Sequence, residues 1–312
     1  MILIQATRPN PYTGSPLDRA VHRREDAAWI VAALAAPESL FVPVWQAKNL
    51  IDDADPAAPA ANFLAGRTVG ALFHSSDDAG GFPWVFLGLM DGRAVFAFDV
   101  GAAEPLRLLP GVRGHFVDLR SVPGLLPPAE AAVLAHARGL MHWRARARFC
   151  GVCGRACEPA GAGHVMRCPA CGTEHFPRTD PAVIMLVSDG SRALLGHSHR
   201  FPRTAMYSTL AGFVEPGESL EEAVAREVAE ETAIRVGSVQ YHSSQPWPFP
   251  GSIMLGFYAE ALSTEIRIQT DELRDARWFS REEIAGHESR GFSLPRPDSI
   301  ARHLIEDWMA SG

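Results

Sequence analysis

The sequence predicts an α/β protein made of three parts. A smaller α+β domain is expected over residues 1–140, a zinc ribbon with a lead-in helix over residues 141–177, and a last α/β domain over residues 178–312. Three observations lead to this expectation. Apolar runs of strand length alternate with helical patterns, all five cysteines fall within one short segment, and one helix in the last third is strongly acidic.

The first part shows short apolar runs separated by turn-rich segments. Strands are expected at TVGALF (68–73), WVFLGLM (84–90) and RAVFAFDV (93–100). Residues 127–149 have the pattern of a helix that leads into the cysteines. Three arginines near its end, at 144, 146 and 148, could contact nucleic acid, but we interpret them as a solvated face.

The cysteines form two C-x-x-C pairs, each followed by glycine. Cys150 and Cys153 form the first pair, and Cys168 and Cys171 the second. This spacing predicts one tetrahedral zinc site, and four protein ligands make such a zinc structural. Disulfides are disfavoured by the lack of a secretory signal, and isolated buried thiols by the clustering. Cys157 is left over as an incidental ribbon residue.

The last part is expected to begin with two strands over residues 180–198 and a further strand near Tyr207–Leu210. A helix follows from 219 to 234, then a strand at 252–262. Residues 276–284 predict a strand that passes into a helix, and residues 299–310 a closing amphipathic helix.

The helix after Ser219 carries the most specific chemical signal. Ser219 and Glu222 form the pattern of a capping box, and apolar residues at helical spacing predict one buried side. Glu227, Glu230 and Glu231 are three and four residues apart, so they project together. Clustered carboxylates repel one another, and a divalent cation such as Mg²⁺ or Mn²⁺ removes that repulsion and prepares the site for phosphate oxygens. An isolated acidic run would more often be a solvated helix face.

Composition limits the class of protein. With 312 residues, 47% of them hydrophobic, the chain can bury substantial cores. It has no apolar run of membrane-spanning length and no signal-peptide pattern at its start, so we expect no membrane partner and a cytoplasmic location. A net charge of -7 disfavours binding along extended nucleic acid.

The segment GFVEPGESLEEAVAREVAEETAI, from Gly212 to Ile234, closely resembles the Nudix box. The resemblance implies an α/β/α sandwich with a mixed sheet, and hydrolysis of a nucleoside diphosphate linked to another group. One position departs from the pattern, because Ala233 stands where the family usually has glycine. If the backbone there is left-handed, the departure costs roughly 1 kcal/mol.

The Nudix box, the four-cysteine ribbon and the segment SQPWPFP together resemble the NADH pyrophosphatase family, also called the NAD-capped RNA hydrolases. The resemblance runs from about residue 140 to the C-terminus. It implies metal binding by the carbonyl of Ala211 and the carboxylates of Glu227, Glu231 and Glu272, with Glu230 as a further ligand or the base. Glu260 is a weaker alternative to Glu272, and Arg226 is expected to orient the glutamates by ion pairing.

The same resemblance implies the substrate-binding residues. Phe176 and Phe213 match the aromatic positions that hold the nicotinamide, although Phe176 replaces the commoner tyrosine. Ala301 matches a residue contributed across a homodimer interface. The remaining expected residues form the substrate loop: Gln245, Pro246, Trp247, Pro248, Phe249, Pro250, Gly251 and Ser252. Taken alone, this loop could be a proline-rich surface turn with buried aromatic rings.

We therefore expect metal-dependent hydrolysis of NAD(H) to nicotinamide mononucleotide and AMP. The first alternative is removal of the NAD cap from RNA 5′ ends by the same site, and a weaker one is broader activity on ADP-ribose. An alternative of another class is a zinc-ribbon nucleic-acid binding module with a degenerate Nudix domain, which the intact glutamates disfavour.

Overall fold

The computed structural model describes residues 6–69, 83–101, 111–122, 124–200 and 205–312. The chain forms two compact units. The C-terminal unit comprises Met1–Pro11, Asp180–Pro246 and Ser252–Gly312, and the N-terminal unit comprises Tyr12–Thr179 and Trp247–Gly251. The expected division into three parts at residues 140 and 177 stays a prediction.

The C-terminal unit is built on a mixed sheet. Its strands run in the order β14-β15-β11-β12-β16, with β13 paired to β11. Strands β11 and β15 are parallel, whereas β11 is antiparallel to β12 and to β13. The strands are β11 (Asp180–Ser188), β12 (Arg192–Ser198), β13 (Leu210–Phe213), β14 (Val236–Trp247), β15 (Ser252–Ala261) and β16 (Leu273–Ser280).

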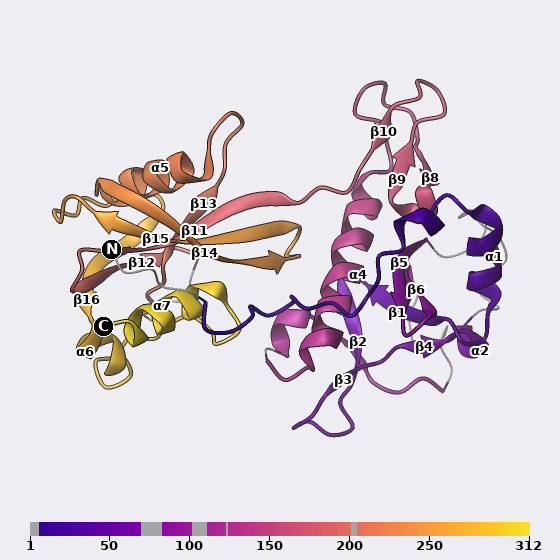
Figure 1. Ribbon diagram of the computed structural model, residues 1–312, viewed down its shortest axis with the longest axis horizontal. Coiled ribbons are helices and arrows are strands. Elements are labelled where there is room, and N and C mark those ends of the chain that lie inside the picture. Colours follow the sequence, from indigo (N-terminus) through magenta and orange to yellow (C-terminus); the bar gives the residue numbers. More distant parts are fainter. Residues whose placement is uncertain (1–5, 70–82, 102–110, 123, 201–204) are drawn as a thin grey trace. The chain divides into compact units, whose positions relative to one another are not determined.

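Helices cover both faces of this sheet, as Figure 1 shows for α5 (Leu220–Thr232) and α7 (Ile300–Ala310). Alternate residues of β11 point to opposite faces, because the side-chain period of a strand is two. Val183 and Met185 share a core with the apolar side of α5. Ile184 and Leu186 share a second core with α7. The predicted α/β/α sandwich with a mixed sheet is confirmed.

Two expectations about strands in this unit are wrong in detail. The strand expected near Tyr207–Leu210 is β13, which begins at Leu210. The twelve-residue strand β14 was not anticipated, and the start of the SQPWPFP segment lies in it and not in a loop. Its burial does not alternate regularly, because β14 is an edge strand, where a proline such as Pro246 is tolerated.

The N-terminal unit contains a second sheet with the order β3-β2-β1-β6-β5, to which β4 adds by pairing with β1 and β7 by pairing with β2. Its faces are covered by α1 (Ala27–Ala35) and α4 (Pro128–Arg146), seen on opposite sides of the sheet in Figure 1. The strands are β1 (Leu40–Trp45), β2 (Lys48–Asp52), β3 (Ala60–Ala61), β4 (Leu64–Ala65), β5 (Trp84–Met90), β6 (Arg93–Asp99) and β7 (His115–Val117).

Both units follow one chain path. In the C-terminal unit, β11 forms a hairpin with β12, pairs with the short strand β13 before a helix, and lies parallel to β15. In the N-terminal unit, β1 has the same relations to β2, to the short strand β4 and to β6. The helix after β4 is α2 (Gly66–Val69), which corresponds in order to α5 after β13. The N-terminal unit is thus a second sandwich of the same topology, although its sequence has no second copy of the acidic box.

The strands expected at 84–90 and 93–100 and the helix expected from 127 are confirmed. The strand expected at 68–73 is wrong where it can be compared, because Thr68 and Val69 lie in α2, and its other residues lie outside the described ranges. The three arginines do not share one solvated face. Arg144 is buried at 4% exposure, whereas Arg146 and Arg148 are exposed.

After α4 the chain forms a small three-stranded sheet with the order β10-β9-β8. Its elements are β8 (Glu158–Ala160), the 3-10 turn η4 (Gly161–Gly163), β9 (Val165–Arg167) and β10 (Glu174–His175). This sheet carries the cysteine pairs. The chain also contains two more 3-10 turns, η1 (Val21–Arg23) and η3 (Leu119–Ser121), and the short helix α6 (Arg281–Ala285).

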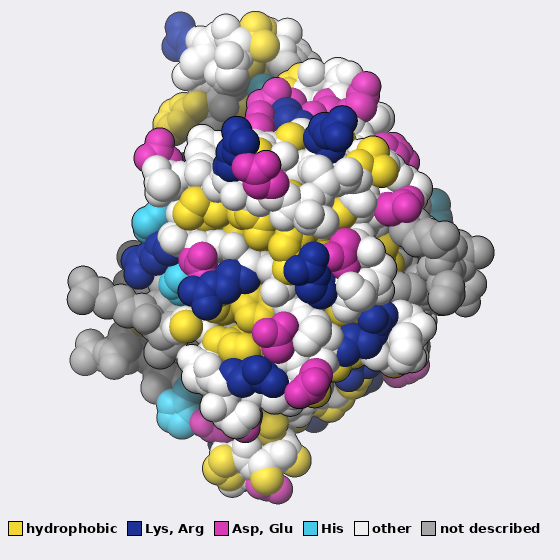
Figure 2. Space-filling model, turned by 90° about the vertical axis from the view of Figure 1, so that its left-hand side faces the viewer, with side chains coloured by type: hydrophobic (Ala, Val, Ile, Leu, Met, Phe, Trp, Pro, Cys, Tyr) yellow, Lys and Arg dark blue, Asp and Glu magenta, His cyan; other side chains and the backbone are white. Residues whose placement is uncertain are grey.

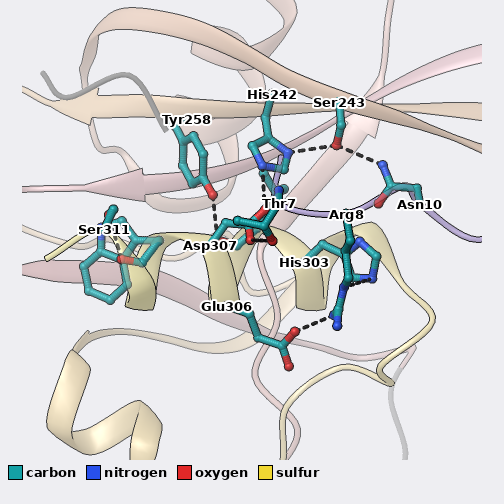
Figure 3. Close-up of polar contacts among 12 residues, drawn as sticks. Thr7, Arg8, Asn10, His242, Ser243, Tyr258, His303, Glu306, Asp307 and Ser311 are labelled. Carbon is teal, nitrogen blue, oxygen red and sulfur yellow. Dashed lines mark hydrogen bonds and ion pairs between the residues drawn. The ribbon is translucent and has the colours of Figure 1, made fainter. Parts of the chain in front are cut away.

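The start of the chain is held against α7 by a buried polar cluster (Figure 3). The Thr7 backbone N–H donates to Asp307 Oδ2 at 3.3 Å, and His242 Nε2 lies 2.9 Å from the same oxygen. Asn10 Nδ2 donates to Ser243 Oγ at 2.9 Å. Burial lowers the pKa of His242, against the raising effect of Asp307. These contacts place residues 7–10 inside the C-terminal unit.

Helix α5 begins and ends as its sequence indicates. The Ser219 hydroxyl accepts from the Glu222 N–H at 3.2 Å, and Glu222 Oε2 accepts from the Ser219 N–H at 2.8 Å, so the capping box is confirmed. At the other end Ala233 has φ 58° and ψ 12°, the left-handed conformation, and its N–H donates to the Ala229 carbonyl. A side chain at this position is strained.

We expect Ala233→Gly to raise the free energy of unfolding by about 1 kcal/mol, because glycine adopts a left-handed backbone without steric cost. Urea denaturation of the two proteins measures the difference. Ala229→Gly, at an exposed position inside the same helix, is the control and should lose about 1 kcal/mol. Equal or lower stability of Ala233→Gly would contradict the strain argument.

Candidate active site and metal centres

Three carboxylates converge in the C-terminal unit. One oxygen each from Glu227, Glu231 and Glu272 lies within 4.8 Å of the others. Glu227 and Glu231 are one helical turn apart on α5 and are buried, at 8% and 6% exposure. Glu272 is exposed and comes from the turn before β16. The local helix therefore supplies two of the carboxylates and a distant turn supplies the third.

A close approach between helix and strand fixes the position of Glu227. A Cβ added at Gly212 would lie 1.8 Å from the Glu227 Cδ. Gly212 lies on β13, paired with Val183 of β11. Only glycine leaves room for the carboxylate at this point of the strand, which explains why the box needs a glycine there.

Arg226 connects the acidic helix to the segment before it. Its guanidinium makes two hydrogen bonds to Glu218, at 2.7 and 3.0 Å. It also donates to Glu227 Oε1 and Glu230 Oε2, each at 2.9 Å, and to the carbonyl oxygen of Phe213 at 2.9 Å. These bonds raise the pKa of Arg226, the bond to Glu218 most strongly. The expected pairing of Arg226 with glutamates is thus present.

Glu218 is the residue whose role the sequence analysis missed. Its fixed distance of eight residues before Arg226 was visible in the printed sequence, but spacing alone did not indicate a bidentate pair. Hydrogen bonding to Arg226 lowers the pKa of Glu218, so this carboxylate stays ionised.

The two carboxylates of α5 in this group, Glu227 and Glu231, have raised pKa values. Burial, followed by the charges of Glu227 and Glu272, raises the pKa of Glu231 to about 8. Burial also raises the pKa of Glu227, against the opposing effect of Arg226. Glu231 Oε2 is buried and has no hydrogen-bond partner among the described residues. An orphaned oxygen within a set of hard oxygen donors fits a divalent cation of the Mg²⁺ type.

Glu230 and Glu260 lie outside this group of three, and metal binding by the carbonyl of Ala211 stays a prediction. Glu230 is exposed and is held by Arg226. Glu260 accepts a hydrogen bond from Ser238 at 2.9 Å and is likewise exposed. Ala211 lies on β13, opposite Ile184 of β11. The structure therefore brings Glu272, and not Glu260, to the carboxylates of α5.

The two phenylalanines expected to hold the nicotinamide are both exposed. Phe213 ends β13 in the C-terminal unit, and Phe176 follows β10 in the N-terminal unit. Each side chain is 58% exposed. Such rings offer free faces for stacking with a base.

The expected substrate loop is anchored at both ends. Gln245 is fully buried, and its amide donates to the Asp298 carbonyl and accepts from the Ile300 N–H, each at 2.9 Å. The amide of Gln245 thus secures the start of α7. The loop's Pro246 and Ser252 lie on β14 and β15, and Gly251 just before β15.

The aromatic residues of this loop pack within the N-terminal unit. Trp247 and Phe249 contact each other edge to face at 5.0 Å and pack on the core beneath α4. The Arg138 guanidinium lies 4.4 Å from the centre of the Phe249 ring. Pro248 is buried and Pro250 is exposed. The anchoring agrees with the alternative of a turn with partly buried rings, and direct contact of the loop with substrate stays a prediction.

Ala301 lies on α7 and is buried at 5% exposure in the core that α7 shares with the sheet. Its expected part in a homodimer interface stays a prediction.

The four paired cysteines gather as the spacing predicts. The Sγ atoms of Cys150, Cys153, Cys168 and Cys171 lie within 4.8 Å of one another. Cys150 and Cys171 are 3.7 Å apart, and Cys153 and Cys168 are 3.5 Å apart. Thiolates bound tetrahedrally to zinc lie about 3.8 Å apart, so the geometry fits this ion.

Each cysteine pair forms a tight turn closed by its glycine. Gly154 and Gly172 have φ of 73° and 76°, and their N–H groups donate to the carbonyls of Cys150 and Cys168 at 2.9 Å. Cys157 lies outside this group of thiols. The glycines after the pairs are thus explained by the left-handed backbone of the turns.

Comparison with known families covers most of the chain. Residues 178–297 match the NUDIX domain, residues 38–143 the NADH pyrophosphatase-like rudimentary NUDIX domain, and residues 145–176 the NADH pyrophosphatase zinc ribbon domain. The match at residues 38–143 agrees with the repeated topology of the two sandwiches.

Relatives are found in several bacteria. The chain is 36% identical over 284 residues to a protein of Deinococcus radiodurans named NAD-capped RNA hydrolase NudC, with 89% of this chain and 90% of the relative covered. It is 42% identical over 224 residues to a protein of that name from Stutzerimonas stutzeri, covering 72% of this chain and 76% of the relative. The chain belongs to the Nudix hydrolases, in the family that joins an NADH pyrophosphatase-like domain and a zinc ribbon to the Nudix domain.

Proposed function

We propose that this protein hydrolyses the diphosphate of NAD(H), giving nicotinamide mononucleotide and AMP, and that the same site removes the NAD cap from RNA 5′ ends. The observation that carries the proposal is the convergence of Glu227, Glu231 and Glu272, with an unsatisfied oxygen on Glu231. The relatives named NAD-capped RNA hydrolase support the substrate.

The carboxylates would hold Mg²⁺ or Mn²⁺ with the carbonyl of Ala211. When bound, the cation supplies the positive charge that accepts phosphate oxygens and stabilises the leaving phosphate. Arg226 acts as a positioning residue, because it holds Glu227 and Glu230 in place. Glu230 lies outside the group of three and has an exposed carboxylate, which favours the role of base over that of ligand.

The cysteine site would hold a structural zinc, since four thiolates leave no open position. The homodimer and the cytoplasmic location also belong to the proposal, and they rest on the family resemblance. No helix within the described ranges is both long enough and apolar enough to cross a membrane. Light scattering coupled to gel filtration would test the dimer.

The face drawn in Figure 2 shows no continuous basic patch that would favour the rival nucleic-acid binding module. On the face drawn in Figure 2, the Lys and Arg side chains are interspersed with Asp and Glu. Incubation with Mg²⁺ and equal amounts of NADH, NAD⁺, ADP-ribose and NAD-capped RNA, followed by product separation, would rank the enzymatic substrates. Absence of hydrolysis of all four, with gel shifts by uncapped RNA, would favour the rival.

Glu231→Gln should lower the hydrolysis rate of NADH by about 100-fold or more, because it removes a ligand of the ion that stabilises transition-state charge. The matched control is Glu260→Gln, a carboxylate of the same unit outside the group of three, which should change the rate less than about twofold. A Glu231→Gln enzyme that keeps a tenth of the wild-type rate would refute the metal site.

The metal-free protein should lose stability as the pH rises from about 4.5 to about 8, the window between the unperturbed and the raised pKa of Glu231. The folded state binds the proton more tightly than the unfolded state, so the stabilisation is complete below this window and is lost above it. Denaturation at pH 5 and pH 8 should show a difference of a few kcal/mol. Mg²⁺ should diminish this difference in stability between the two pH values, and the Glu231→Gln protein should largely lack it.

Phe213→Ala and Phe176→Ala should each reduce kcat/KM for NADH by about ten- to a hundredfold, because stacking on the nicotinamide is lost. ADP-ribose lacks this base and should be affected far less. Tyr241→Ala, which removes another exposed ring of the C-terminal unit, is the control. Equal losses on both substrates would show that the rings support the fold instead.

Elemental analysis should find about one zinc per chain. Cys150→Ser should lose the zinc and lower the melting temperature before it affects the chemistry, since a closed site contributes folding energy. Cys157→Ser should keep the zinc and the wild-type melting temperature, because this thiol lies outside the group of four. Zinc-free protein that is folded and active would contradict the structural site.

A further inference from the structure

A cavity of about 210 Å³ lies within the N-terminal unit, in a region to which neither the motifs nor the proposed reaction assigns a role. Six parts of the unit line it: the residues between η1 and α1, the helix α1, the first residue of β5, the helix α4, the strand β8 and the ribbon turn η4. The polar side chains in this lining are Arg24, Glu25, Trp84 and Arg144.

Two residues of this lining each carry a buried donor that has no acceptor. Arg24 Nε and Trp84 Nε1 are both buried and lack a hydrogen-bond partner among the described residues. Trp84 as a whole is 5% exposed. An indole N–H and a guanidinium can only donate, so only an acceptor satisfies them. Buried polar groups in folded proteins are nearly always paired, which makes two orphaned donors on one cavity informative.

The cavity also has an excess of positive charge. Arg144 is buried at 4% exposure and donates to the carbonyl of Trp84. Arg24 makes no ion pair within the described part of the chain. Glu25 is the one carboxylate in the lining, and it is exposed to solvent, which screens its charge.

The positive charges near this cavity also act on a neighbouring histidine. His164 follows η4, and its Nε2 lies 2.7 Å from the carbonyl oxygen of Phe86. Burial, followed by the charges of Arg24 and Arg19, lowers the pKa of His164 to about 4, against the raising effect of that hydrogen bond. His164 is therefore neutral at physiological pH and does not add to the repulsion.

The ribbon turn that lines the cavity has an unusual backbone. Gly161, Ala162 and Gly163 have successive φ of 54°, 51° and 88°. A Cβ at Gly163 would lie 2.7 Å from the Trp84 carbonyl oxygen, so the turn is packed closely on the start of β5. Turns of this kind can present consecutive backbone N–H groups to an anion.

We propose that this cavity binds a phosphate group, with Arg24 and Trp84 donating to its oxygens and Arg144 supplying further positive charge. The ionised oxygens of a phosphate accept hydrogen bonds and do not donate, which matches a lining of donors. The binding site is additional to the diphosphatase site and does not depend on it.

The phosphate belongs to a free compound or to an RNA strand, and a second cavity favours the strand. This cavity, of about 250 Å³, shares Arg144 and Pro159 with the first. It is also lined by Arg148 and Phe149, whose ring is 63% exposed, with the Arg148 guanidinium 5.9 Å from its centre. An exposed ring beside positive charge is what single-stranded RNA requires, whereas a lone phosphate needs neither.

Calorimetric titration of the full-length zinc-loaded protein with inorganic phosphate tests the proposal. No Mg²⁺ or Mn²⁺ is added, so that the carboxylates of α5 repel the anion. Arg24→Gln and Trp84→Phe should each weaken binding about tenfold. Arg23→Gln is the matched control and should not change it, since Arg23 pairs with Asp26 and does not line the cavity. Absence of binding, or equal binding by wild type and Arg24→Gln, overturns the proposal.

The same titration with an uncapped RNA of ten nucleotides identifies the source of the phosphate. If it is an RNA strand, binding is weakened by both Arg24→Gln and Phe149→Ala, while inorganic phosphate is insensitive to Phe149→Ala. If it is a free compound, Arg24→Gln weakens only the binding of inorganic phosphate. Thermal melting checks that each variant folds. Arg24→Gln should hydrolyse NADH at the wild-type rate, so failure of this proposal and failure of the diphosphatase proposal give different results.

Discussion

Repulsion among the carboxylates of α5 is the constraint around which the C-terminal unit is arranged. Glu227 and Glu231 are buried beside Glu272, and their charges oppose one another. Arg226 offsets part of this repulsion by bonding Glu227 while Glu218 holds its guanidinium on the other side. At Glu231 the charge of Arg200 acts against the remainder, but Glu231 still keeps an oxygen without a hydrogen-bond partner among the described residues. A site that is unfavourable without a cation binds one strongly, because the ion relieves the repulsion.

The fold by itself does not account for this chemistry. Both units contain a sandwich with the same order of strands, yet the acidic box occurs in the C-terminal one alone. Function therefore resides in the residues carried by the helix after the short strand, and not in the topology. The N-terminal sandwich keeps the architecture, and the partly buried aromatic residues Trp247 and Phe249 of the expected substrate loop pack against its core.

Sequence patterns were most informative where the determining contacts are local. The capping box of α5, the spacing of Glu227 and Glu231, and the cysteine turns involve residues within a few positions of one another. Edge strand β14 and helix α2 were missed or misassigned, because their sequences carry no regular alternation and their state depends on pairing with distant strands. Arg144 looked like a surface residue for the same reason, since its burial is imposed by β5.

By itself, the sequence determined the acidic helix, the clustering of its glutamates, the thiol site and the family, because helical periodicity and ligand spacing are properties of short segments. Only the tertiary structure decided that Glu272 and not Glu260 completes the carboxylate group, that Glu230 stays outside it, and that Arg24 and Trp84 meet at one cavity. Each of these results depends on side chains brought together from separate segments by sheet pairing and core packing, and no local pattern specifies such distances.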